Sequence, residues 1–182
     1  MIKVDFEFNK IKRIYEELII TPKISKEKNY FSKFKKQLFI SQINTDIPAG
    51  ILLEDSYIAL LKTMLLFNEK SFCCLITEGK ETNKCNENDS YFLIDKDTDY
   101  KFYKKYIEEN FIFEENILFS LNKNWSLLLT QDFFGILAGT DAFIEQYKKN
   151  YPKWKNDALE VIKTYKNSSF FLNQLLPVIT EK

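Results

Sequence analysis

Histidine is absent from the 182-residue sequence, and this absence removes several classes of enzyme. Without an imidazole the chain has neither a Ser-His-Asp nor a Cys-His catalytic arrangement, and it lacks the commonest general base at neutral pH. A zinc site built on histidine is excluded for the same reason. Any catalysis would therefore depend on carboxylate, tyrosine or lysine side chains.

Arginine is nearly absent as well. Arg13 is the only one, and 26 lysine and arginine residues balance 26 acidic residues. Nucleic-acid-binding proteins usually carry a basic excess and use arginine for bidentate contacts to phosphate or guanine, so this class is disfavoured. One basic segment, residues 23–36, alternates lysines with Tyr30, Phe31 and Phe34. That pattern either stacks bases or forms a buried helical stripe surrounded by lysines.

Glycine and proline occur only four times each, and no stretch has the composition of a linker. We therefore predict one domain over residues 1–182. Three cysteines are too few for a disulfide framework, which favours a reducing compartment. Neither a signal peptide nor an apolar run of ~20 residues, as needed to span a bilayer, is visible. The expectation is a cytoplasmic protein without a membrane partner.

What the chain has in abundance is apolar and aromatic residues, at 45% and 16% of the total. Three short apolar runs, 117–121, 125–130 and 134–139, are separated by turn-forming residues and predict a β-meander. Thr140 then predicts the N-cap of a helix that ends near Asn150. Gly135 and Gly139 are expected to mark a bulge and a tight strand-to-helix turn.

The remaining pattern alternates helical and strand-like segments. The predicted fold class is therefore α+β, with an antiparallel or mixed sheet that contains the meander and is flanked by helices. Strands are expected at 71–77, with Cys73 and Cys74 on opposite faces, and at 91–94. Helices are expected after Asn9, at 54–68, after Thr98 or Asp99, after Asn156 and at 170–179, while 4–8 and 38–43 are either strand or helix.

No motif in the sequence predicts a catalytic, cofactor-binding or metal site. Asp95, Asp97 and Asp99 have the spacing of the first ligands of a calcium loop, but Tyr100 replaces the required glycine and Tyr106 replaces the bidentate glutamate. The three aspartates are better explained as an acidic helix N-terminus. Gly79-Lys80 lacks the rest of a phosphate-binding loop, and neighbouring carboxylates such as Glu108 and Glu109 diverge on a helix.

Charge is unevenly distributed along the chain. Residues 1–40 hold ten basic and five acidic residues, whereas residues 81–116 hold five basic and ten acidic. Carboxylates interleaved with tyrosines suit docking to a basic protein, because carboxylates steer association and tyrosine rings anchor it. The alternative is a solvated face without a partner. The candidate partner-binding residues are Glu87, Asp89, Tyr91, Asp95, Asp97, Asp99, Tyr100, Glu108, Glu109, Glu114 and Glu115, with Tyr103 among the interleaved tyrosines.

The segment from Trp125 through Asp132 and Gly139 to Phe143 and Ile144 resembles the C-terminal part of several small bacterial immunity proteins. These are cytoplasmic antidotes encoded beside contact-dependent or other polymorphic toxins. The resemblance covers about thirty residues, and nothing in residues 1–110 adds to it. It implies a protein that binds a toxin and occludes it, with no catalytic residues or cofactor of its own.

The hypothesis that follows is a non-enzymatic, protein-binding immunity protein whose partner is a toxin domain, for example a basic nuclease. Two alternatives stay open. One is an enzyme with an unrecognised carboxylate, tyrosine or lysine site. The other is a nucleic-acid or regulatory adaptor that uses residues 23–36.

Overall fold

The computed structural model describes residues 4–20, 31–43, 46–77, 84–85, 90–110 and 115–165. Five helices and six strands make up this part of the chain. The helices are α1 (Val4–Leu18), α2 (Glu54–Leu66), α3 (Tyr100–Asn110), α4 (Asp141–Asn150) and α5 (Trp154–Tyr165). The strands are β1 (Gln37–Ser41), β2 (Ser71–Ile76), β3 (Tyr91–Asp95), β4 (Asn116–Ser120), β5 (Trp125–Leu129) and β6 (Phe134–Gly139).

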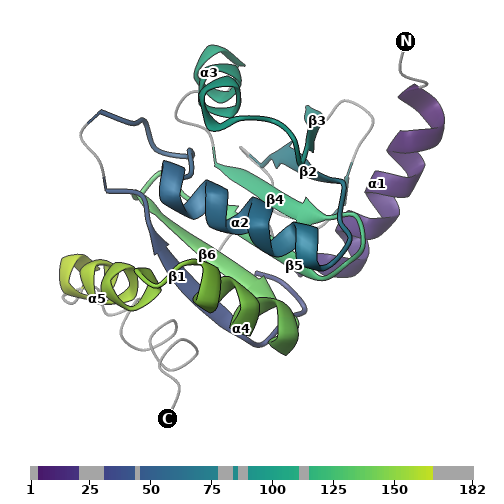
Figure 1. The fold of residues 1–182 in the computed structure, drawn as a ribbon. Coiled ribbons are helices and arrows are strands. Elements are labelled where there is room, and N and C mark those ends of the chain that lie inside the picture. Colours follow the sequence, from purple (N-terminus) through teal and green to yellow (C-terminus); the bar gives the residue numbers. More distant parts are fainter. Residues whose placement is uncertain are drawn as a thin grey trace.

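The six strands form one open sheet in the order β1-β6-β5-β4-β2-β3 (Figure 1). Every neighbouring pair is antiparallel. Strands β4, β5 and β6 lie side by side in chain order, so the predicted meander is confirmed. With helices packed on an antiparallel sheet, the fold class is α+β as predicted.

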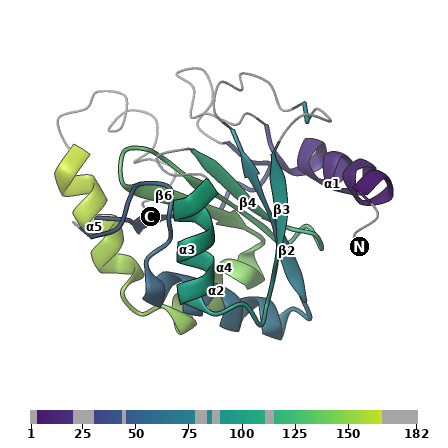
Figure 2. The ribbon, with the colours of Figure 1, turned by 90° about the horizontal axis from the view of Figure 1, so that it is seen from above.

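Both faces of the sheet are apolar, because successive side chains of a strand point to opposite sides. Leu127 and Leu137 belong to a core shared with α2, α3 and α4, which we call the α2-side core. Leu128 and Ile136 belong to a core shared with α1, the α1-side core (Figure 2). Cys73 lies in the α1-side core and Cys74 in the other, as expected, and burial raises the pKa of both thiols.

Two helices begin earlier than the sequence analysis expected. α1 starts at Val4, so residues 4–8 are helical, and Asn9 lies inside the helix instead of capping it. α5 starts at Trp154 instead of near Asn156. The reason for the first error is that the helical apolar face extends further back than Asn9. It consists of Phe8, Ile11, Ile14, Tyr15 and Leu18, all of them buried.

The helix after the meander is confirmed as predicted. The hydroxyl of Thr140 accepts a hydrogen bond from the backbone N–H of Phe143 at 3.3 Å, which caps α4. Gly139 is the last residue of β6, and a Cβ there would meet the carbonyl oxygen of Asn124 at 3.1 Å. Gly135 lies in regular register with both neighbouring strands, so no bulge occurs at this position. It is needed instead because a Cβ would crowd β5.

The end of α2 is shaped by Asn68, which adopts the left-handed conformation with φ 55°. The N–H of Asn68 donates to the carbonyl of Leu65 at 3.1 Å, and the N–H of Glu69 donates to that of Met64 at 3.0 Å. These two hydrogen bonds form a Schellman motif, which ends the helix and turns the chain sharply. The turn directs Glu69 back into the protein, where the side chain is buried.

Glu69 is a buried carboxylate that neutral groups satisfy. Its oxygens accept hydrogen bonds from Ser120 Oγ at 2.7 Å, Asn124 Nδ2 at 2.7 Å and Trp125 Nε1 at 3.0 Å. A carboxylate removed from water needs such partners, because burial without them is very unfavourable. The Glu69 cluster, as we name these four residues, therefore ties the end of α2 to the turn between β4 and β5.

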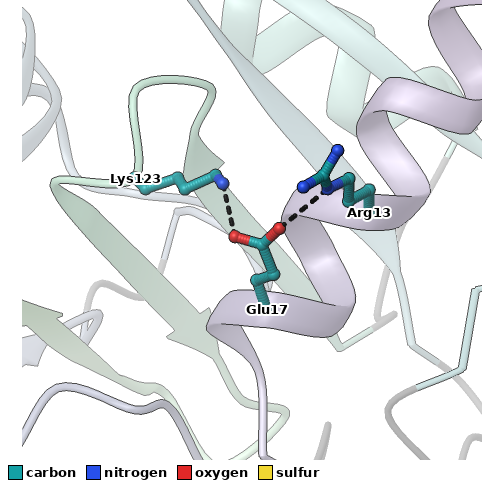
Figure 3. Close-up of polar contacts among 3 residues, drawn as sticks. All are labelled: Arg13, Glu17 and Lys123. Atoms are coloured by element: carbon teal, nitrogen blue, oxygen red, sulfur yellow. Dashed lines mark hydrogen bonds and ion pairs between the residues drawn. The ribbon is translucent and has the colours of Figure 1, made fainter.

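An exposed ionic contact joins α1 to the same β4–β5 turn (Figure 3). Glu17 accepts from Arg13 Nε at 3.0 Å and forms a second ion pair with Lys123. The hydrogen bond from Lys123, followed by that from Arg13, lowers the pKa of Glu17. Because all three side chains are solvated, this contact orients α1 more than it stabilises the fold.

Several expectations fall wholly or partly outside the described residues. These include the helix at 170–179 and most of the basic segment 23–36. Phe31 is described and is buried in the α1-side core, but it belongs to an irregular segment and not to a helix. Among the described helices, none combines the length and the hydrophobicity that a membrane span requires.

Candidate partner-binding surface at the β3–α3 edge

The predicted acidic residues that the structure describes lie mainly on β3 and α3 at one end of the sheet (Figures 1 and 2). Asp95 is the last residue of β3, Asp97 lies in the following turn, and Asp99 immediately precedes α3. Glu108 and Glu109 lie in the last turn of α3. A helix of this length spans roughly 15 Å. The carboxylates therefore form two groups at the two ends of α3, and not one continuous patch.

The remaining acidic candidates are not part of these groups. Glu115 lies just before β4, and its carbonyl oxygen accepts the N–H of Thr77 at 3.0 Å. Glu87, Asp89 and Glu114 lie outside the described residues.

Two of the aspartates have local structural roles. Asp95 Oδ1 accepts the backbone N–H of Asp97 at 3.0 Å and so closes the turn after β3. Asp99 Oδ1 accepts the backbone N–H of Phe102 at 2.8 Å, which makes Asp99 the N-cap of α3. The interpretation of the three aspartates as an acidic helix start therefore holds for Asp99 alone, because Asp95 is the last residue of β3 and Asp97 lies in the turn. Reversing their charge would cost some fold stability in addition to any effect on a partner.

Lysines neutralise much of the remaining acidic charge. Lys96 Nζ lies 2.6 Å from Asp97 Oδ1, and this hydrogen bond raises the pKa of Lys96. Along α3, Lys104 pairs with Glu108 and Lys105 with Glu109, each at 3.6 Å and at i,i+4 spacing. The i,i+4 spacing of these lysines and glutamates is visible in the sequence and predicts ion pairs. A count of the acidic residues alone does not take these pairs into account.

The tyrosines point mostly inward. Tyr103 is 2% exposed and stacks on Tyr57 at 4.4 Å between ring centroids. The hydroxyl of the partly buried Tyr100 donates to the carbonyl of Leu52 at 3.0 Å, and burial raises the pKa of Tyr100 to about 12. The ring of Tyr91 packs near Phe8 at 5.9 Å. These rings stabilise the fold, and Tyr103 in particular is too buried to anchor a partner.

Two exposed apolar side chains lie on this edge, and the sequence analysis did not single them out. Leu93 of β3 is 38% exposed and Phe102 of α3 is 62% exposed. The ring of Phe102 stacks on that of Tyr106 at 6.3 Å, and Tyr106 in turn packs on Phe92 at 4.8 Å. An aromatic row therefore connects the outer face of α3 with β3.

Helical spacing puts Tyr106 and Glu109 on the same face of α3 as Phe102. We call the resulting set the β3–α3 surface. It consists of Asp97 in the turn before α3 and of Phe102, Tyr106 and Glu109 on α3. Leu93 and Asp95 belong to the adjacent edge strand, but their side chains point to the α1-side face of the sheet.

A second site candidate is an open cavity of ≈ 480 Å³ beside the start of α2. The cavity leaves no local pattern in the sequence, because its walls come from segments far apart in the chain. Within it, Lys153 forms an ion pair with Asp55. It is lined by Asp46, Ile47, Leu53, Glu54, Asp55, Tyr100, Lys104, Tyr151, Lys153 and Asp157.

Asp157 is the buried carboxylate of this cavity, at 8% exposure. Its Oδ2 accepts the hydroxyl of Tyr151 at 2.9 Å and the backbone N–H of Ser41 at 3.0 Å. Burial raises the pKa of Asp157, and the two hydrogen bonds oppose this rise only in part. The nearby charges of Glu160 and Lys153 act in opposite directions, the first raising the pKa and the second lowering it.

We expect the stability of the Asp157→Asn variant, relative to that of wild type, to increase as pH rises. In the native state the raised pKa makes Asp157 hold its proton more tightly than in the unfolded chain, where the pKa is about 3.9. The unfolding free energy of wild type minus that of Asp157→Asn should therefore fall as pH rises from about 4 through the native pKa. Urea unfolding of both proteins between acidic and neutral pH measures this difference. A difference that grew with pH would contradict the assignment.

Within the described ranges, no group of three or more cysteine, aspartate or glutamate side chains is arranged to hold a metal ion. Comparison with known proteins gave no match to any family model, curated protein or solved structure.

Proposed function

We propose that this protein binds another protein through its β3–α3 surface and acts as an immunity protein that occludes a toxin domain. The composition of the surface supports the proposal. Apolar side chains with an adjacent rim of carboxylates are typical of interfaces, where the apolar groups provide binding energy and the charges steer association. The resemblance of the meander and α4 to bacterial immunity proteins points to the same class.

The observation that carries the proposal is the exposure of Phe102. A phenylalanine ring 62% exposed on a helix contributes little to the core, although the adjacent Tyr103 on the same helix is 2% exposed. Aromatic side chains in such positions are the residues that dominate binding energy when a partner covers them. Asp97 and Glu109 are both exposed, the first in the turn before α3 and the second in its last turn.

The test is co-expression with the product of the adjacent gene, because immunity proteins are encoded beside their toxins. Wild-type protein should co-purify with that product and restore growth. We expect Phe102→Glu to weaken the complex by about 30-fold or more, as for loss of a binding hot spot. Leu159→Glu is the matched control, since Leu159 is 64% exposed and lies on α5 instead of α3.

Both variants should unfold at temperatures close to that of wild type, because both positions are solvated. Equal weakening by the two substitutions would assign the effect to charge in general and not to the β3–α3 surface. Growth that is no better with the wild-type protein than without it would refute the immunity function itself.

A second candidate function, an enzyme or small-molecule receptor, is favoured by the cavity that contains Asp157. Its volume of ≈ 480 Å³ lies in the range of ligand sites, and acidic side chains outnumber lysines among its lining residues. A cationic metabolite that stabilised wild type but not Asp157→Asn in a thermal-shift screen would favour this function over toxin binding.

A further inference from the structure

The two edges of the sheet differ in how their backbone groups are satisfied. In β1 the backbone groups of the even-numbered residues form hydrogen bonds with β6. The bonds at the two ends of the strand, from Gly139 N to Lys36 O and from Gln42 N to Phe133 O, fix this pattern. The odd-numbered residues consequently direct their N–H and C=O groups away from the sheet. At Ser41 this outward N–H donates to Asp157 of α5 at 3.0 Å. Helix α5 thus protects the β1 edge from further strand pairing.

The β3 edge has no such cover in the described part of the chain. Bonds from Ile76 N to Ser90 O and from Lys96 N to Lys70 O show that the even-numbered residues of β3 face β2. The backbone groups of Leu93 and Asp95 therefore point away from the sheet, and β3 is its terminal strand. Leu93 and Asp95 are both exposed. A terminal strand in this state is a template for an additional strand.

We propose that the partner of this protein docks by adding an extended, antiparallel strand to β3, with a lysine or arginine opposite Asp95. This inference rests on the proposed protein-binding function and specifies its geometry. Pairing takes place through the outward N–H and C=O groups of Leu93 and Asp95. The aromatic row from Phe92 to Phe102 lies next to the added strand on the α3 side.

The charges favour a basic partner segment over a second copy of this chain. Asp95 forms no ion pair within the described residues, because Lys96 pairs with Asp97 instead. A strand residue directly opposite a carboxylate is stabilised when it is cationic. In a two-fold pairing of β3 with itself through Leu93, the residue opposite Asp95 would be Tyr91, which leaves the carboxylate without a cation. A partner strand with lysine at its first position and valine at its third and fifth positions matches β3. In antiparallel pairing the lysine lies opposite Asp95, and the two valines lie opposite Leu93 and Tyr91.

The probe that tests this inference is the acetylated and amidated peptide Lys-Thr-Val-Thr-Val. When it is added at millimolar concentration to the isotope-labelled full chain, we expect the amide signals of Leu93 and Asp95 to shift and their hydrogen exchange to slow. Glutamate in place of the peptide lysine should weaken binding about tenfold. Methylation of the peptide nitrogen of the first valine should abolish binding, because that N–H is the one that faces Leu93.

The protein variant Leu93→Pro removes the outward donor without removing a bond to β2, so an edge strand tolerates it. It should lose peptide binding, whereas Leu93→Thr, which keeps the N–H, should retain it. If Leu93→Pro does not fold, the methylated peptide still tests the hydrogen bond on wild-type protein. Absence of binding, or equal binding of the methylated peptide, overturns the inference. Concentration-dependent dimers that Leu93→Pro abolishes would overturn it in favour of self-pairing.

The inference and the proposed function fail separately. A toxin that is neutralised equally by wild type and Leu93→Pro would leave the function intact and refute docking on β3. Specific peptide binding at Leu93 without neutralisation of the adjacent gene's product would leave the docking mode intact and refute the toxin as partner.

Discussion

Replacement of Glu69 by alanine should lower the unfolding free energy by about 3 to 4 kcal/mol. The substitution leaves Trp125 Nε1 and Ser120 Oγ without their acceptor, and both atoms belong to buried residues. Each buried donor that loses a charged acceptor costs on the order of 1–3 kcal/mol, and the costs are not fully additive. Equilibrium unfolding in urea gives the value, provided that the transition is two-state.

Two control variants separate the loss of the Glu69 hydrogen bonds from a general effect of removing a glutamate. Glu69→Gln should cost about half as much, since one oxygen remains while the new NH₂ group faces another donor. Glu109→Ala, at an exposed glutamate of α3, should change the unfolding free energy by no more than about 0.5 kcal/mol. If Glu69→Ala cost as little as Glu109→Ala, the Glu69 cluster would not contribute to stability.

The parts of the fold that the sequence predicted correctly are those set by local patterns. The meander was visible because three apolar runs are separated by turn residues, and α4 was visible because Thr140 precedes an amphipathic segment. The strand order could not be predicted, since β1 pairs with β6, a strand that begins more than 90 residues later in the chain. Such pairing depends on contacts between distant residues that no local pattern encodes.

Glu69 shows why the buried polar residues were missed. A glutamate between Asn68 and Lys70 has the composition of a solvated helix end, and only the Schellman turn directs it inward. The residue that accepts the hydrogen bond from Trp125 Nε1 could therefore not be identified from the sequence, although a buried tryptophan N–H usually has an acceptor. The cavity beside α2 was missed for the same reason, because Asp157 and Asp55 are brought together only by packing.

The candidate surface was predicted in part. The sequence located its acidic residues on β3 and α3, but it suggested tyrosine anchors that turn out to be mostly buried. The rule that aromatic residues on a helix face the core held for Tyr103 and failed for Phe102 one residue earlier. Neighbouring residues on a helix point about 100° apart, so only one of such a pair can face the sheet directly.

Trp125 and Glu69 should be energetically coupled, and this is the second large effect we expect. Trp125 is fully buried and packs on Phe143 and Phe72, each at 5.7 Å between ring centroids. Trp125→Ala should cost about 3–5 kcal/mol, as for other buried aromatic residues. Trp125→Phe keeps an aromatic ring and removes the Nε1 donor, so it should cost less and mainly report the bond to Glu69.

A double-mutant cycle with Glu69→Gln and Trp125→Phe separates this bond from packing. Each single substitution disrupts the same contact, so the double variant should be less destabilised than the two effects added, by about 0.5–3 kcal/mol. Ile58→Ala with Trp125→Phe is the matched control, because Ile58 lies at the opposite end of α2 and is 38% exposed. Additive effects in both cycles would assign Trp125 to packing alone. Coupling confined to Glu69 would establish that the carboxylate connects the end of α2 to the meander.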